Sequence, residues 1–253
     1  MQKHLYILTG ASRGMGLAMA RLLLQQGHHL LTLSRRPAPE LEAVAAAQGA
    51  TLEQWSVDLT DAAPVARRLQ QWLAARPAGE RWHSATLINN AGVIPPLVPL
   101  SQGTPDDLAQ ALRVGLEAPM QLCAAFLGAS DGWAIPRRVL NISSGLGRRA
   151  MASQSAYCAA KAGMDHFTRC LALDEAHKPQ GAKVCSLAPG VIDTDMQLQL
   201  RGSSAATFPD QANFAALKNN GQLTRPQDAA ARLLAYLERP DFGTQPVADV
   251  RDA

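Results

Sequence analysis

Three side chains in the middle of the chain have the types and spacing needed to protonate an oxygen atom that acquires negative charge. Ser144 follows the apolar run Val139–Ile142, and Tyr157 and Lys161 are four residues apart, so that they share one face of a helix. Hydride addition to a carbonyl group develops negative charge on its oxygen, which an acid must then protonate. In this interpretation Tyr157 is the acid, Lys161 is the cation beside it, and Ser144 holds the oxygen.

The lysine matters because the pKa of a phenol in water is about 10. An ammonium group about 4 Å away, at an effective dielectric constant of about 20, contributes roughly 4 kcal/mol, or up to about three pKa units. We therefore expect Lys161, together with an oxidised nicotinamide, to lower the pKa of Tyr157 toward neutrality. A tyrosine and a lysine on one helix are common by themselves, so the hypothesis also requires a site for a hydride donor.

A glycine-rich turn near the N-terminus has the pattern of a dinucleotide site. The segment Thr9–Gly16 lies between the first apolar run and a helical pattern, which is the context that a phosphate-binding turn requires. Gly10 permits a tight turn, Gly14 lets the backbone approach a pyrophosphate, and Gly16 lets the helix lie close to the strand. The free N–H groups and the positive dipole end of that helix would face the phosphates.

The residues after the second apolar run favour NADP(H) over NAD(H). An NAD-selective site has an acidic side chain there for the ribose hydroxyls, whereas a 2′-phosphate is bound by arginine. Ser34 and Arg35 occupy this place, and the first acid, Glu40, comes too late. We expect Arg13 and Arg35 to bind the 2′-phosphate, with the Ser34 hydroxyl adding a hydrogen bond. The competing interpretation makes Arg35 and Arg36 ordinary solvated surface.

The elements that must position these residues follow from the alternation of short apolar runs with longer helical patterns. Near-continuous apolar strands indicate a parallel sheet covered on both faces. The sequence therefore predicts an α/β fold, a single doubly wound parallel sheet of the Rossmann type with about seven strands and helices on both faces. No linker-like stretch divides it, so residues 1–253 are expected to form one domain. The runs used here are His4–Thr9, His29–Leu33, Thr51–Val57, Thr86–Ile88, Val139–Ile142 and Lys183–Leu187.

The segment Thr194–Thr224 departs from this alternation because it contains no strand signal and has a Gly/Ser/Ala-rich stretch. Long irregular segments in compact domains are usually lids or disordered. Since it follows a strand, it belongs at the carboxyl edge of the sheet, where such folds bind ligands. We expect a mobile lid whose apolar side chains favour aromatic or dicarbonyl substrates over charged sugars, namely Met196, Leu198, Leu200 and Phe208.

Composition indicates which partners are not expected. Lys and Arg number 24 against 21 Asp and Glu, and the pairs Arg35-Arg36 and Arg148-Arg149 are isolated, which is typical of a solvated face. The four cysteines are widely spaced and match no zinc pattern. No apolar run reaches the roughly 20 residues of a membrane span, and the first ten residues lack the layout of a signal peptide. We expect a cytoplasmic protein that binds no nucleic acid, membrane or metal.

With these motifs in place, the chain resembles the short-chain dehydrogenase/reductase family along nearly its whole length. Thr9–Gly16, Asn89–Gly92, Ser144 with Tyr157 and Lys161, and Pro189-Gly190 with Thr194 match in order and spacing. The resemblance implies that Ile192 and Thr194 bracket the nicotinamide carboxamide, while Asp58-Leu59 suits the adenine amine. The residues expected at the cofactor are Gly10, Ser12, Arg13, Gly14, Met15, Gly16, Ser34, Arg35, Asp58, Leu59, Asn90, Ala91, Gly92, Tyr157, Lys161, Pro189, Gly190, Ile192 and Thr194.

One position departs from the family pattern. The family usually has an asparagine in the long helix after the fourth strand, where it supports a water chain to the catalytic lysine, and Gly115 stands there in this chain. Glycine can adopt the local helix distortion and leave a carbonyl for water, but it supplies no side-chain amide. A catalytically weak protein that senses NADP(H) is therefore kept as the alternative to an NADP-dependent carbonyl reductase.

Within the family, the C-terminal third is similar to sepiapterin reductases and bacterial benzil reductases. That resemblance implies a substrate anchor at Asp249, the alternative being a solvated tail residue. The residues expected at a small carbonyl substrate are thus Ser144, Met196 and Asp249. Family members also pair through the helices that correspond to Asp106–Leu127 and Ser153–His177, so a homodimer or homotetramer is expected. Those helices carry apolar residues on more than one face, including Met120, Leu122, Phe126, Met164 and Phe167.

Overall fold

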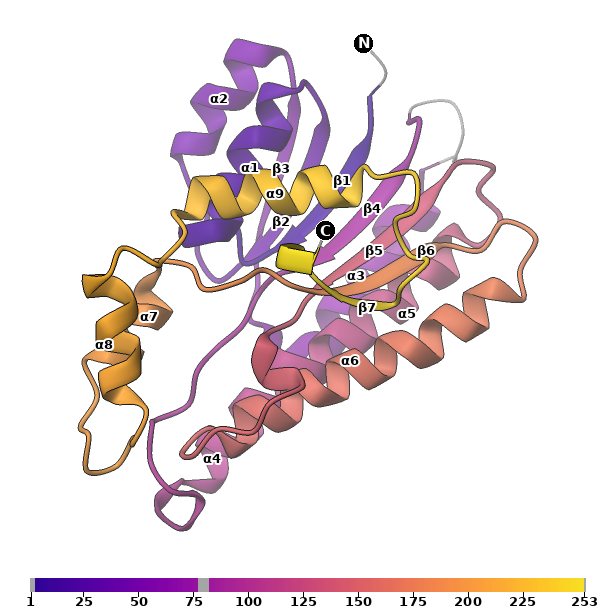
Figure 1. Cartoon of the computed structure of the whole chain (residues 1–253). Coiled ribbons are helices and arrows are strands. Elements are labelled where there is room, and N and C mark those ends of the chain that lie inside the picture. The colour runs from indigo at the N-terminus through magenta and orange to yellow at the C-terminus, as the bar shows by residue number, and fades with distance from the viewer. Residues whose placement is uncertain (1–2, 77–81, 253) are drawn as a thin grey trace.

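The protein is built on one seven-stranded sheet, in which all neighbouring strands are parallel (Figure 1). The computed structural model describes residues 3–76 and 82–252. The strand order is β3-β2-β1-β4-β5-β6-β7, which confirms the predicted fold class. The strands are β1 (Leu5–Thr9), β2 (His29–Ser34), β3 (Thr51–Ser56), β4 (Ala85–Asn89), β5 (Arg137–Ile142), β6 (Lys183–Ala188) and β7 (Val247–Asp249).

Helices cover both faces of this sheet, as the near-continuous apolar strands predict (Figure 1). On one face, Met19 and Leu24 of α1 and Leu233 of α9 pack in a core with Leu8 of β1. On the other face, side chains of α3 and α5 form a second core with β1, β2 and β4. The helices are α1 (Gly14–Gln25), α2 (Glu40–Gln48), α3 (Ala62–Ala74), α4 (Pro105–Leu112), α5 (Ala118–Ser130), α6 (Ser155–Ala176), α7 (Asp195–Arg201), α8 (Gln211–Asn219) and α9 (Pro226–Leu237).

The long helix predicted at Asp106–Leu127 is interrupted by a π-helical turn, Arg113–Glu117, between α4 and α5. Gly115 lies buried in this turn. A Cβ atom at this position would lie 3.0 Å from the Cβ of Ala160, the residue before Lys161 in α6. The helix distortion expected of Gly115 is thus present, and the small residue lets α6 approach closely.

Side-chain hydrogen bonds fix the carboxyl ends of β1, β4 and β5 relative to one another. The Thr9 hydroxyl accepts hydrogen bonds from the N–H groups of Asn90 and Ala91, both at 2.9 Å. The Asn90 amide donates to the carbonyl oxygens of Thr9 and Gly10. Asn89 donates to the Asn141 side chain at 2.8 Å. These contacts make the edge of the sheet a rigid support for the loops above it.

The segment Thr194–Thr224 is not irregular, contrary to the expectation from its composition. It contains α7 and α8, which are seven and nine residues long and too short for a clear helical period. Its two ends are joined, because Ile192 and Thr224 form a parallel bridge. The Asp193 carboxylate then forms ion pairs with Arg201 of α7 and Lys218 of α8. The segment is therefore a helical flap anchored at its base.

The apolar residues that indicated an oligomer interface divide into two groups. Leu122, Phe126 and Met164 have no exposed surface and belong to the core of the subunit. Phe167 is half-buried against the core, and Met120 is 42% exposed. The exposed apolar side chains of these helices are thus Leu112 of α4, Met120 of α5 and Leu173 of α6.

Across the ranges 3–76 and 82–252, no helix is long and apolar enough to span a bilayer.

Candidate active site

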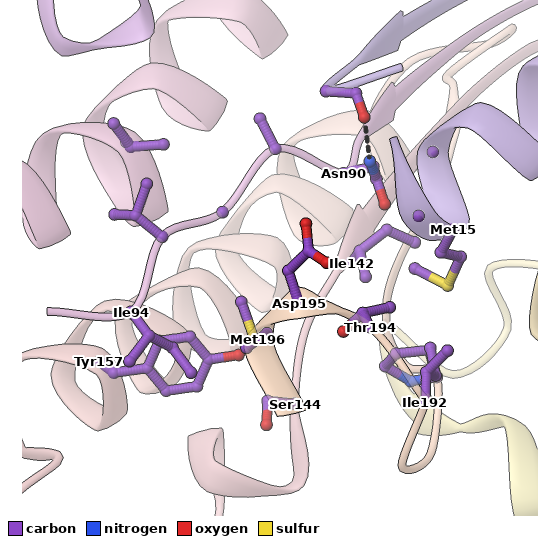
Figure 2. A pocket seen from close by; sticks show the side chains of 18 of the residues that line it. Met15, Asn90, Ile94, Ile142, Ser144, Tyr157, Ile192, Thr194, Asp195 and Met196 are labelled. Atoms are coloured by element: carbon purple, nitrogen blue, oxygen red, sulfur yellow. Dashed lines mark hydrogen bonds between the residues drawn. The ribbon is translucent and has the colours of Figure 1, made fainter. Parts of the chain in front are cut away.

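A cavity of about 750 Å³ lies at the carboxyl edge of the sheet, where β1, β2, β4, β5 and β6 end. Every residue predicted to act in catalysis or to bind the cofactor lines it, and so does Met196. Figure 2 shows Met15 and Asn90 in one part of this cavity and Tyr157, Ser144 and Met196 in another. Two sets of residues that are far apart in the sequence thus share a single space.

The glycine turn has the geometry that a pyrophosphate requires. Gly10 and Gly14 have φ values of 71° and 56°, which side-chain-bearing residues rarely adopt. A Cβ atom at Gly10 would lie 2.9 Å from the Cα of Ala91, and one at Gly16 would overlap the carbonyl oxygen of Gly10. Arg13 precedes α1 without a side-chain cap, so the first N–H groups of the helix are free to bind an anion. The residues present therefore fit a dinucleotide phosphate.

The three side chains predicted to bind a 2′-phosphate are not equally available. Ser34 Oγ accepts a hydrogen bond from the N–H of Ala11 at 2.9 Å, which leaves its own O–H free to donate. Arg13 forms an ion pair with Asp195 at 2.9 Å, with both side chains mostly exposed. Arg35 is exposed at the cavity and forms no ion pair with any residue of the described ranges. Of the two arginines, Arg35 is thus the one whose guanidinium has no ion-pair partner among the described residues.

Asp58, expected at the adenine, occupies a turn that fixes its carboxylate. Its Oδ1 accepts hydrogen bonds from both the N–H and the hydroxyl of Thr60 at 2.9 Å. These bonds, the backbone one first, hold the pKa of Asp58 below its ordinary value. Asp58 is therefore ionised at neutral pH, and its carboxylate can accept a hydrogen bond from an amine.

The three catalytic candidates lie together where β5 meets the first turns of α6. Tyr157 and Lys161 are buried, at 8% and 5% exposure, although both line the cavity. The Lys161 ammonium donates to the carbonyl oxygen of Ile142 at 2.7 Å and lies 5.9 Å from the centre of the Tyr157 ring. Ser144 follows Ile142 by two residues, and Leu146 donates its N–H to the Ser144 hydroxyl at 3.2 Å. Lys161 is therefore fixed to the strand end that carries Ser144.

Burial controls the protonation states of this group. It raises the pKa of Tyr157, and a hydrogen bond with Ser144 opposes that shift. Burial lowers the pKa of Lys161 to about 8, while the charge of Asp165 opposes the decrease. The expected decrease in the pKa of Tyr157 beside Lys161 is thus not found in the protein alone, because desolvation of the phenolate dominates. Tyr157 holds its proton at neutral pH, as a proton donor must.

The apolar wall predicted from the flap is only partly present. Met196 and Leu200 line the cavity, joined by Ile94, Val114 and Leu146, which sequence reasoning missed. Leu198 points to solvent, at 53% exposure, and Phe208 is fully buried in a small cluster with Leu97 and Leu200. Helix α7 exposes one face to the cavity and another to solvent, and the sequence does not reveal which residue faces which side.

Asp249, the predicted substrate anchor, is buried at the end of β7 and does not line the cavity. Its carboxylate is bound by the Arg251 guanidinium at 2.6 and 2.8 Å, and Arg251 lines the cavity instead. The ion pair with Arg251 also lowers the pKa of Asp249. The structure therefore places Arg251, and not Asp249, where a bound molecule could touch it.

The pair Arg148-Arg149, interpreted from the sequence as solvated surface, is exposed, and it also approaches functional groups. Arg148 lies 3.7 Å from the buried carboxylate of Asp165, and Arg149 lines the cavity. The signal that could have indicated this is their position, four and five residues after Ser144.

The fold and the site define an oxidoreductase of the dinucleotide-binding α/β class. Residues 4–204 match the family model for short chain dehydrogenase, and the chain belongs to that family. A benzil reductase of Bacillus cereus that forms (S)-benzoin is 34% identical over 236 residues, covering 93% of this chain and 94% of its own. A sepiapterin reductase of Meriones unguiculatus is 31% identical over 257 residues, covering 97% and 95%.

A solved structure of similar shape is the 3-oxoacyl-[acyl-carrier protein] reductase of Brucella melitensis in complex with NAD. It has a TM-score of 0.81 and 22% identity, and the match covers 99% of this chain and 96% of that one. At this identity the likeness bears on the fold alone.

Proposed function

We propose that this protein reduces a small ketone or dicarbonyl compound to the alcohol with NADPH. The observation that carries the proposal is the placement of Ser144, Tyr157 and Lys161 in the same cavity as the glycine turn. A hydride donor held by that turn and a carbonyl held by Ser144 would lie within one enclosed space.

Each residue of the site has a role in this reaction. Bound NADPH supplies the hydride. The Ser144 hydroxyl donates a hydrogen bond to the carbonyl oxygen and stabilises the charge that develops there. Tyr157 donates its proton from Oη to that oxygen, since burial keeps the hydroxyl protonated. The Lys161 ammonium, fixed by the carbonyl of Ile142, stabilises the tyrosinate that remains.

The preference for NADPH over NADH rests on the adenosine end of the cavity. Arg35 and Ser34 line it, and the end of β2 offers no carboxylate to bind ribose hydroxyls. Arg13 can contribute after it leaves Asp195, at a modest free-energy cost, because exposed ion pairs are worth about 0.2–1 kcal/mol.

The substrate class is proposed from the wall and from the relatives. The side chains of Ile94, Val114, Leu146 and Met196 suit an apolar or aromatic body next to the carbonyl. The named substrates of the benzil and sepiapterin reductases are compounds of this kind. Arg149 adds a cation to this side of the cavity, so an acidic group is tolerated on the substrate.

A panel of carbonyl compounds, followed by the absorbance of NADPH, tests the proposal. The panel contains an aromatic diketone, a cyclic ketone with and without a carboxylate, and a sugar phosphate. Turnover of the diketone or a ketone is expected. Tight binding of NADPH without turnover of any compound would favour the alternative, a protein that senses NADP(H), for which Gly115 in place of the usual asparagine is the supporting observation.

A further inference from the structure

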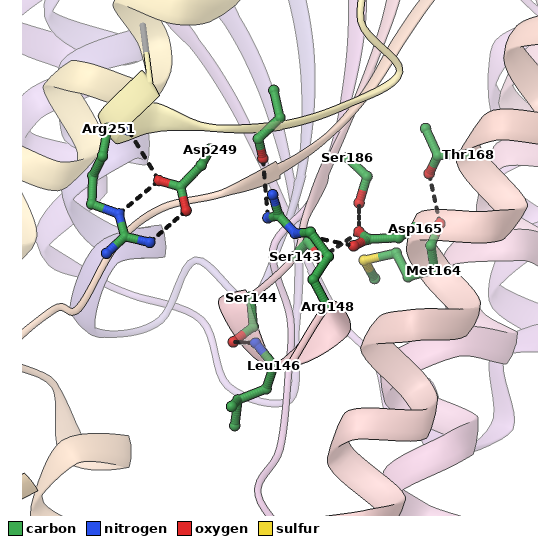
Figure 3. A network of polar contacts seen from close by, with 11 residues as sticks. Ser143, Ser144, Leu146, Arg148, Met164, Asp165, Thr168, Ser186, Asp249 and Arg251 are labelled. Carbon is green, nitrogen blue, oxygen red and sulfur yellow. Dashed lines mark hydrogen bonds and ion pairs between the residues drawn. The ribbon is translucent and has the colours of Figure 1, made fainter. Parts of the chain in front are cut away.

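A buried carboxylate outside the catalytic trio lies one helical turn beyond Lys161. Asp165 is 1% exposed. Its Oδ1 accepts hydrogen bonds from the hydroxyls of Ser143 at 2.5 Å and Ser186 at 2.6 Å, which lie at the end of β5 and on β6 (Figure 3). Burying a carboxylate costs free energy unless the group is paired or hydrogen-bonded, so the contacts of Asp165 must offset that cost.

The other oxygen of Asp165 is incompletely satisfied. Oδ2 accepts no hydrogen bond from any residue in the ranges 3–76 and 82–252. The nearest cation is the Arg148 guanidinium, whose Nε lies 3.7 Å away, beyond hydrogen-bonding distance. Gly147 keeps this space open, because a Cβ atom there would lie 2.8 Å from Oδ2. One carboxylate oxygen thus accepts two hydrogen bonds and the other accepts none from the described residues.

Within the ranges 3–76 and 82–252, Asp165 is the charged group that acts on the pKa of Lys161. Within α6 Lys161 lies near the Tyr157 ring and Asp165, and Arg148 is the cation 3.7 Å from that carboxylate. Cys185 of β6 also lies near Asp165, and burial raises the pKa of this thiol to about 12, so that it is uncharged. Asp165 supplies the one carboxylate among these groups, and its charge opposes the effect of burial on the pKa of Lys161.

We propose that Asp165 is a positioning residue of this site: its carboxylate fixes the strand end that carries Ser144 and is the counter-charge of the Lys161 ammonium. Ser143, which donates to Asp165, is the neighbour of Ser144, and Lys161 bonds to the residue before Ser143. One anion therefore holds the strand end and the cation together. The inference rests on the proposed use of Lys161 as a cation in catalysis.

Titration of Lys161 by NMR tests this without any turnover. The chain has five lysines, Lys3, Lys161, Lys178, Lys183 and Lys218. A sample with ¹³C-labelled lysine therefore gives few signals, and the signal that is lost in Lys161→Met is that of Lys161. The wild-type signal should titrate near pH 8. Asp165→Asn should lower that pKa by about one unit, because an opposite charge nearby favours the ammonium.

Two further variants separate charge from packing. Ser186→Ala removes one hydrogen bond to Asp165 but keeps the carboxylate, so the pKa of Lys161 should stay close to that of the wild type. Arg148→Met removes the cation beside Asp165 and should raise the pKa by about a few tenths of a unit. With a carbonyl substrate, the alkaline decline of kcat should move to lower pH in Asp165→Asn by the same amount as the titration.

An unchanged titration in Asp165→Asn, or an equal decrease in Ser186→Ala, would overturn the proposal. If Asp165→Asn does not fold, Arg148→Met decides: an increase in the pKa of Lys161 supports the counter-charge, and no change or a decrease refutes it. A protein that shows the predicted titrations but reduces no carbonyl would contradict the proposed function and leave this inference standing.

Discussion

Arg13 Nη1 lies 2.9 Å from Asp195 Oδ2, which joins the phosphate-binding turn to the first residue of α7. Gly14 and Thr194 approach each other beside this ion pair. Both Arg13 and Asp195 line the cavity, so the pair links the cofactor side to the flap. A phosphate that attracts Arg13 would compete with Asp195, and the arginine that can bind it without such competition is Arg35.

Replacing Arg35 with aspartate should reverse the cofactor preference. The wild-type protein should use NADPH at least about tenfold more efficiently than NADH, since a hydrogen bond to a charged group contributes about 1.5–3 kcal/mol. In Arg35→Asp, kcat/KM for NADPH should fall by about 10–100-fold and that for NADH should rise. Arg36→Asp makes the same charge change at a neighbour that does not line the cavity, and should keep the preference. Equal use of both cofactors by the wild type would contradict the assignment.

Replacing Tyr157 with phenylalanine should abolish most turnover and leave cofactor binding nearly unchanged. The substitution removes only the proton donor, and general acid catalysis typically contributes about 10²–10⁴-fold. The decisive measurements are kcat with a carbonyl substrate and the Kd for NADPH by fluorescence. Tyr236→Phe is the matched control, because that hydroxyl is on α9 and does not line the cavity. Retention of a third of the activity in Tyr157→Phe would mean that another group donates the proton.

The sequence predicted those parts of the site that depend on local geometry. Gly10, Gly14 and Gly16 are required by the turn itself, and Tyr157 and Lys161 are brought together by helical spacing alone. Five of the six predicted strands are largely buried, whereas β3, at the edge of the sheet, has a single buried residue. The strand that was missed, β7, has three residues, which is too few for a period.

What the sequence could not predict depends on contacts between distant segments. Asp165 meets Ser143 and Ser186 only because β5, β6 and α6 lie in a particular register, over separations of 22 and 21 residues. The burial of Asp249 likewise follows from the pairing of β7 with β6. Nothing in the residue types distinguishes such partners from solvated neighbours.

The flap formed by α7 and α8 should become more protected when NADP⁺ binds. It is anchored at Asp193 and carries Met196 and Leu200 into the cavity, while its outer residues are exposed. Lids of this kind exclude water during the reaction. Hydrogen exchange followed by mass spectrometry should show slower exchange across Gln197–Asn220 with NADP⁺, and no change in β5, which is protected in both states. Strong and unchanged protection of the flap would show that it is simply a packed part of the domain.

Self-association should depend on the exposed apolar side chains of α4, α5 and α6. Leu112, Met120 and Leu173 are 41%, 42% and 66% exposed. Light scattering at micromolar concentration should give a dimer or tetramer for the wild type, and Met120→Glu with Leu173→Glu should shift it toward the monomer by placing charges in an apolar interface. Leu198→Glu, at an exposed position on α7, is the matched control and should not dissociate it. A monomeric wild type would refute the prediction.

The histidines at the amino end of the sheet should make the protein lose stability in mild acid. His4 and His28 lie with ring centres 4.9 Å apart, and the His4 ring is hydrogen-bonded to Ser84. Burial, the largest cause for both residues, lowers their pKa values below 6.5, and their mutual repulsion lowers that of His28 further. In the interval between about pH 6.5 and the lowered pKa values, the unfolded chain binds more protons than the folded one.

His4 and His28 should therefore leave the free energy of unfolding unchanged above about pH 6.5. As the pH falls below about 6.5 and through the lowered pKa values of the folded protein, that free energy should decrease. Urea denaturation at pH 7.5, 6.5 and 5.5 measures this slope. His28→Gln removes one of the two interacting rings and should make the decrease smaller, while His166→Gln, at an exposed position on α6, should not change it. An identical slope in His28→Gln and the wild type would show that other groups cause the acid sensitivity.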